Sequence, residues 1–197
     1  MNLQIMNEFW LYFKLGLNHV LDMQAYDHVL FIVVLVAAYN FSDWKKLLGL
    51  VSLFTLGHTI SLLLASYSIA SVSSSVIEFL IPITILITAF FNIIASRKSN
   101  HSEKIGLLLI ITFFFGLIHG FGFATYFNMI KDDTTILPLL EFALGIEIAQ
   151  IIIVIIVLII SFIFQSFLRF NKRDWILIIS SLVIGIVIPM LIENWSF

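Results

Sequence analysis

The segment Gly116-Leu-Ile-His119-Gly-Phe-Gly-Phe-Ala124 places one histidine among glycines and phenylalanines, inside a stretch from Ile105 to Phe127 without formal charge. Such a stretch is long enough to cross a bilayer, so it predicts a membrane-spanning helix with His119 well inside the hydrocarbon. An ionisable group at that depth is costly and usually faces a bundle interior, pairs with another group or binds an ion. Gly116 and Gly120 would let another helix approach closely beside the imidazole. His119 is therefore a candidate functional residue, with a simple hydrogen bond to a neighbouring helix as the alternative.

The composition around this segment is that of a polytopic membrane protein. Of the 197 residues, 61% are hydrophobic and only 11% are charged, and soluble domains do not have such a composition. The absence of cysteine excludes disulfides and thiolate metal sites. A net charge of -2 gives no reason to expect a nucleic-acid partner.

The apolar runs predict an all-α fold, a polytopic membrane helix bundle of about six transmembrane helices plus an N-terminal interfacial helix. One transmembrane domain is expected over residues 1–197, with residues 1–24 as the interfacial helix or lid and residues 25–197 as the six-helix bundle. The predicted spans are residues 25–41, 47–66, 76–95, 105–127, 136–164 and 175–192.

Basic residues predict how the bundle is oriented. The three basic loops, marked by Lys45, Arg97 and Arg173, all follow odd-numbered predicted spans. The positive-inside rule then places these loops in the cytoplasm and both termini on the outer side of a bacterial inner (cytoplasmic) membrane. The lipid bilayer is thus the first expected partner, and a homo-oligomer is compatible with the sequence.

Several separate spans bring ionisable groups to a similar depth. The deep or outer-end groups are Asp27, His28, His58, Glu78, His119, Glu141 and Glu147. At about 1.5 Å per residue, most lie within roughly 5 to 12 Å of the outer edge, with Glu147 near the midplane. The inner half offers only uncharged polar groups. Imidazoles and carboxylates without thiolates suit a divalent transition metal such as Ni²⁺, Co²⁺ or Zn²⁺, held by three histidines and a carboxylate or water. Separate hydrogen-bonded pairs are the competing interpretation.

Individual members carry different weight. His58 and His119 are the strongest candidates, because each is deep and alone on its helix. Asp27 and His28 are adjacent and point about 100° apart, so His28 is the preferred ligand and Asp27 an acceptor for a ring N–H. His19 lies at the interface, as a lid ligand or a solvated side chain.

The acids and the amide of the later spans are candidates for supporting parts around the ligands. Glu147 and Gln150 share a helix face, whereas Glu141 is rotated by roughly 120° from Glu147. Glu78 is shallow enough to be solvated. We expect Glu78, Glu141 and Gln150 to hydrogen-bond around the ligands, and an enzyme would use Glu78, Glu141 or Glu147 as its acid or base.

Five motifs in order resemble the HupE/UreJ family of bacterial membrane proteins. They are Gly16-x-x-His19, Asp27-His28-x-Leu-Phe31, Phe54-Thr-x-Gly-His58-Thr-x-Ser61, Phe115-Gly-Leu-Ile-His119-Gly-Phe-Gly-Phe-Ala124 and Leu144-Gly-x-Glu147-x-x-Gln150. In that family the motif histidines and acids are associated with nickel or cobalt, and some members are described as metal permeases. The resemblance implies a metal site drawn from His19, Asp27, His28, His58, His119 and Glu147. The segment from Val20 to Tyr26 looks longer than in the permeases, which indicates a side branch.

Three functions follow from these observations. The first is a nickel- or cobalt-type metal permease with its capture site in the outer half of the bilayer. The second is a membrane-embedded zinc hydrolase or transferase acting on a lipid-linked substrate, which would need no route through the inner half. The third is a metal-binding accessory or sensor protein. The permease ranks first because of the resemblance.

Overall fold

The computed structural model describes residues 2–22, 26–97, 105–130 and 136–195, and these residues form helices joined by short turns, without strands. The α-helices of the described chain are α1 (Asn2–Leu21), α2 (Asp27–Val36), α3 (Trp44–Ser66), α4 (Ser74–Ala95), α5 (Ile105–Ile130), α6 (Leu137–Ser166) and α7 (Lys172–Glu193). A 3-10 turn, η1 (Phe41–Asp43), precedes α3. The predicted all-helical membrane bundle is confirmed.

Five helices, α3 to α7, are long and apolar enough to cross a membrane. Their bounds agree with the last five predicted spans to within about three residues at either end, because charged loops, or the serine-rich segment of residues 67–73 between α3 and α4, mark the limits of the apolar runs. The predicted first span, residues 25–41, is instead the ten-residue helix α2. Ten residues rise only about 15 Å, half the hydrocarbon thickness. α2 is apolar because the other helices bury it: seven of its ten residues are buried, from His28 to Val36.

Local sequence signals fix several helix ends. Pro138 stands in the first turn of α6, where its missing N–H costs nothing. Asn40 and Asp43 form a capping box at the turn that leads into α3. Ser68 and Arg169 adopt positive φ angles of 57° and 56° just beyond the ends of α3 and α6, where the chain must reverse.

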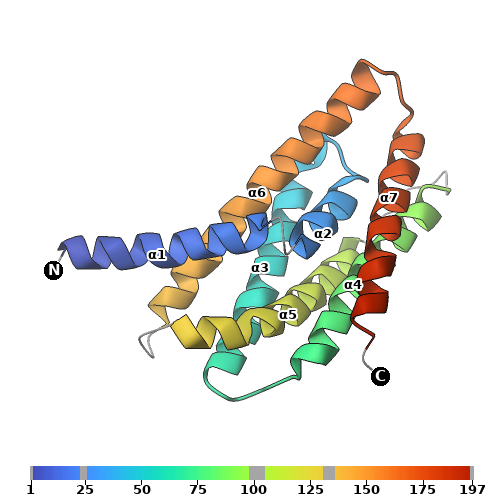
Figure 1. Cartoon of the computed structure of the whole chain (residues 1–197). Helices are drawn as coiled ribbons and strands as arrows, with labels where there is room; N and C mark the ends of the chain where they lie inside the picture. Colours follow the sequence, from blue (N-terminus) through green and yellow to red (C-terminus); the bar gives the residue numbers. More distant parts are fainter. Residues whose placement is uncertain (1, 23–25, 98–104, 131–135, 196–197) are drawn as a thin grey trace.

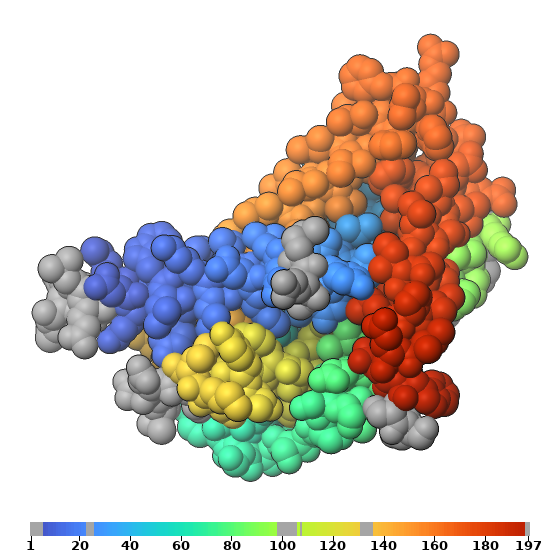
Figure 2. All heavy atoms as spheres, viewed as in Figure 1, coloured from blue at the N-terminus to red at the C-terminus, as the bar shows by residue number. Residues whose placement is uncertain are grey.

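The helices pack chiefly in pairs, α3 against α5, α1 against α6 and α4 against α7, with α2 between them. Figure 1 shows that α1 crosses α6 and runs outward, so that the N-terminus lies away from the bundle. The space-filling view in Figure 2 shows the first half of α1 projecting at the left, between α6 above and the end of α5 below. The second half of α1 ends against the bundle, next to α2.

Glycines let two of these pairs approach to backbone contact. A Cβ at Gly16 on α1 would overlap the carbonyl oxygen of Phe142 on α6, and a Cβ at Gly145 would overlap the carbonyl oxygen of Phe13. At the second crossing, Gly116 and Gly120 of α5 meet the backbone of α3. Small residues at such crossings replace side-chain bulk with close van der Waals contact, which drives helix association in lipid. His19 lies three residues beyond Gly16, and His119 lies between the two α5 glycines.

Candidate metal centre

Three histidines from three different helices meet in the interior of the bundle. His19 comes from the end of α1, His28 from the first turn of α2 and His58 from the middle of α3. Each offers one ring nitrogen such that the three nitrogens all lie within 4.8 Å of one another. His28 and His58 are buried, with 2% and 0% exposure, and His19 is half-buried. We call these residues the histidine triad.

A carboxylate fixes the ring of His28. The Nδ1 of His28 lies 3.0 Å from Oδ1 of Asp27, and the backbone N–H of His28 donates to the same oxygen at 2.8 Å. Because an ionised carboxylate only accepts hydrogen bonds, Nδ1 carries the proton and Nε2 of the neutral ring keeps its lone pair. Within the described chain, that Nε2 is buried and has no hydrogen-bond partner. The arrangement is that of a histidine ligand oriented by a carboxylate.

His119 on α5 lies next to the triad. Its ring centroid is 4.9 Å from that of His28, in an edge-on arrangement. Nδ1 donates to the carbonyl oxygen of Phe115 at 2.8 Å, which again leaves Nε2 with its lone pair. Among the described residues, no group hydrogen-bonds to this buried Nε2. The grouping of three nitrogens within 4.8 Å does not include His119, so its ring flanks the triad through His28.

Aromatic rings enclose the four imidazoles. The ring centroid of Phe123 lies 4.0 Å from that of His19, and the ring centroid of Phe54 lies 5.1 Å from that of His119.

His19 is neutral inside this enclosure. Burial, as the larger cause, and the neighbouring His28, as the next, lower the pKa of His19 well below its ordinary value. The ring is therefore neutral at pH 7 and has a lone pair to offer.

His58 is the most deeply placed member of the triad. Both of its ring nitrogens are buried, and neither finds a hydrogen-bond partner in the part of the chain that the structure describes. Its ring is tilted against the ring of Phe142 at 6.1 Å between centroids. A neutral imidazole carries one N–H donor and one nitrogen acceptor, and the described surroundings of His58 provide a partner for neither.

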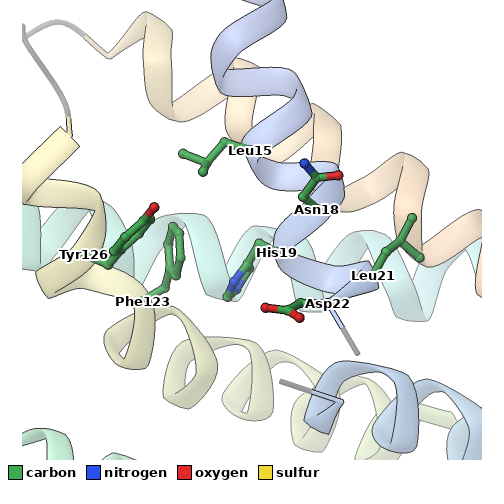
Figure 3. A pocket seen from close by; sticks show the side chains of 7 residues that line it. All are labelled: Leu15, Asn18, His19, Leu21, Asp22, Phe123 and Tyr126. Carbon is green, nitrogen blue, oxygen red and sulfur yellow. The ribbon is translucent and has the colours of Figure 1, made fainter. Parts of the chain in front are cut away.

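A pocket of about 830 Å³ opens onto the triad beside α1. Its lining residues are Leu15, Asn18, His19, Leu21, Asp22, Phe123 and Tyr126. Figure 3 shows the ring of His19 and the carboxylate of Asp22 pointing into it, with Phe123 and Tyr126 on the side of α5. Of the triad, only His19 is among these lining residues, so the pocket meets the site at His19.

The structure places Glu147 in a different polar group. Its two carboxylate oxygens accept hydrogen bonds of 2.5 Å from the hydroxyls of Ser52 and Thr55 on α3. The Oγ1 of Thr55 also lies 3.2 Å from Oε1 of Gln150, which is buried. Glu147 and Gln150 thus share a face, as their spacing predicts, and that face meets α3 on the N-terminal side of His58.

The two remaining predicted acids lie apart from the triad. Glu78 is exposed near the start of α4. Glu141 is buried at 8% exposure near the start of α6 and is not a member of the histidine grouping. Asn18, Asp22 and Tyr126 also line the pocket but are not predictable from the sequence, because polar and aromatic residues near a helix end usually lie at the interface.

The charge pattern of the sequence does not predict a functional part for Ser52 or Thr55. A usable signal existed for them, since residues 52, 55 and 58 recur every three positions and so share a helix face.

A family model described as HupE / UreJ protein matches residues 1–194. No curated protein and no solved structure matches the chain.

Proposed function

The chain belongs to the HupE/UreJ family, and from this premise we propose that it is a permease for a divalent transition metal of the nickel or cobalt type. The observation that carries the proposal is the histidine triad, with three ring nitrogens within 4.8 Å of one another inside an apolar bundle. Imidazole nitrogens are good ligands for Ni²⁺ and Co²⁺, and the chain has no thiolate to compete with them.

The unmet hydrogen-bonding capacity of the site supports a bound ion. Among the described residues, Nε2 of His19, His28, His58 and His119 are all buried without a partner. Each unsatisfied buried polar atom costs about 1 to 3 kcal/mol, so four of them cost a large part of the stability of an ordinary domain. A dication accepts the lone pairs of the three triad nitrogens at once, and binding recovers that part of the cost.

The ligand set follows from the same contacts. His19, His28 and His58 supply the first three nitrogens, and His119 or a water supplies a fourth ligand. Asp27 holds the tautomer of His28 and adds a negative charge close to the ion. Glu147, which the resemblance implies as a ligand, instead hydrogen-bonds to the hydroxyls of Ser52 and Thr55 on α3.

The pocket beside α1 is the entry side in this proposal. A hydrated cation entering between α1 and α5 meets Asn18 and Asp22 first and then His19. We place this pocket on the outer side of the membrane, as the basic loops predict. The charge of Asp22 raises the local cation concentration at the mouth.

Two measurements on the full chain test the proposal. Purified protein exposed to Ni²⁺ and washed is expected to retain one ion per chain by elemental analysis, and His58→Ala is expected to retain none. His101→Ala, a histidine in a predicted loop, is the matched control. Proteoliposomes are expected to take up Ni²⁺ or Co²⁺. A retained ion without any uptake would overturn the permease in favour of a storage, sensor or enzymatic role.

A further inference from the structure

A second polar cluster lies between α3 and α6, next to the histidine triad. We call it the oxygen cluster: Ser52 and Thr55 from α3, and Glu147 and Gln150 from α6. Its atoms are close together, with both hydroxyls 2.5 Å from the carboxylate of Glu147 and Thr55 3.2 Å from the amide oxygen of Gln150. The amide nitrogen of Gln150 is buried and unpartnered within the described chain.

The oxygen cluster continues the same helix interface that holds His58. Thr55 and His58 are three residues apart on α3, so their backbones are separated by about 4.5 Å along the axis. On α6, the ring of Phe142 packs against His58, and Glu147 follows about 7.5 Å further along. Thr55 and Gln150 are buried, while Glu147 is half-buried and Ser52 exposed. The cluster thus extends from the inner end of the triad to the surface of the helix pair.

The histidine triad offers nitrogen ligands, whereas the oxygen cluster offers oxygen ligands. Imidazole nitrogens bind nickel and cobalt well, whereas carboxylate, hydroxyl and amide oxygens hold the same ions more weakly. A single carboxylate offsets part of the charge of a dication, and hydroxyl protons can rotate away to present lone pairs. Conduction needs sites weak enough to release the ion onward, and a strong site followed by a weaker one meets that need.

We propose that the oxygen cluster is a second, low-affinity cation station, which receives the metal ion after it leaves the histidine triad. The inference rests on the proposed permease function and adds the step that follows capture. It also supplies a carboxylate deeper than the triad, at the interface of α3 with α6. A polar clamp that only holds α3 on α6 is the alternative, since buried interhelical hydrogen bonds stabilise membrane bundles modestly.

The test compares Glu147→Gln with wild type in the full chain, with Glu193→Gln at the exposed end of α7 as the matched control. Ni²⁺ binding is measured in detergent by equilibrium dialysis, and Ni²⁺ uptake is measured in proteoliposomes. Wild type and Glu193→Gln are expected to bind one tight ion and one weaker ion. Glu147→Gln should lose the weaker ion and about tenfold or more of the uptake rate, while the affinity for the tight ion changes by less than about threefold.

The double variant Ser52→Ala/Thr55→Val keeps the carboxylate and removes the hydroxyl oxygens, so it tests the cluster even if Glu147→Gln does not fold. It is expected to weaken the second ion and slow uptake with the tight ion unchanged. Loss of the tight ion in Glu147→Gln would assign Glu147 to the histidine site, and unchanged uptake would leave only the clamp. Either result overturns the inference. Wild-type protein that neither binds nor transports Ni²⁺ would instead remove the permease function itself.

Discussion

Replacing Gly16 by alanine is the sharpest test of how the histidine triad is assembled. The new Cβ would overlap the carbonyl oxygen of Phe142 and lie 3.0 Å from its carbon and 3.1 Å from the backbone nitrogen of Ile146. Ordinary contact begins at 3.4 Å. All three neighbours are backbone atoms of α6, which cannot rotate away, so α1 must move outward by about 1 Å.

That displacement decides whether His19 can reach the ion. His19 is three residues beyond Gly16 on the same helix, so it moves with α1, while His28 and His58 stay on α2 and α3. Metal–ligand distances tolerate only about 0.2 Å. Loss of a residue that hydrogen-bonds to a metal ligand typically lowers metal affinity by about 10- to 100-fold. Loss of the ligand His19 itself should cost more, so the Ni²⁺ affinity should fall by about 100-fold or more, or roughly 2.8 kcal/mol.

The assay is Ni²⁺ binding to purified protein by calorimetry, with Gly49→Ala as the matched control. A Cβ at Gly49 meets nothing within 4 Å, and that residue lies on α3, the helix of His58. Gly145→Ala approaches the same crossing from α6 and should reproduce the loss. Wild-type affinity in Gly16→Ala, with the protein folded, would refute the dependence of His19 on this crossing.

Three further substitutions probe the site. Asp27→Asn should lower Ni²⁺ affinity by about 10- to 100-fold while keeping one ion per chain, because the amide no longer enforces a protonated Nδ1 on His28. Calorimetry measures both the affinity and the number of ions bound. A variant that binds no ion would make Asp27 a direct ligand. His28→Ala should abolish retention of the ion in elemental analysis, and full retention would contradict the triad. Asp22→Asn should slow Ni²⁺ association by about twofold to tenfold at low ionic strength without changing stoichiometry; stopped-flow mixing measures it, and an unchanged rate would remove this pocket as the entry.

The long helices were predictable because a segment that crosses the hydrocarbon must be apolar and nearly free of charge along its whole length. The apolar run of residues 76–95, with Glu78 near its start as its one formal charge, predicts a span, and α4 occupies Ser74–Ala95. The same rule misjudged residues 25–41. A helix enclosed by other helices is as apolar as one facing lipid, and α2, with Val34 and Val36 at 0% exposure, is enclosed. Hydropathy does not separate these two cases, but the tertiary structure does.

Counting along a helix predicts the depth of a site residue in its span, but it does not predict the partners of that residue. Counting placed Glu147 near the midplane, and whether it faces His58 or the hydroxyls of Ser52 and Thr55 depends on the rotation and shift of α6 against α3. That packing depends on contacts distant in sequence, such as Thr55 of α3 against Gln150 of α6. The same holds for His19, since an interfacial helix can carry its histidine toward water or toward the bundle, and the crossing of α1 and α6 at Gly16 determines which.

The division of the site between helices gives α1 a distinct part in binding. His28 and His58 sit on helices that are buried or packed deep in the bundle, whereas α1 lies outside the five spanning candidates and half of it projects from the surface. His19 is also the triad member that lines the pocket. An ion arriving through the pocket therefore meets His19 before the two buried rings. A small outward movement of α1 would take away one ligand of three while the other two keep their places, so affinity is most sensitive to the helix that is least embedded.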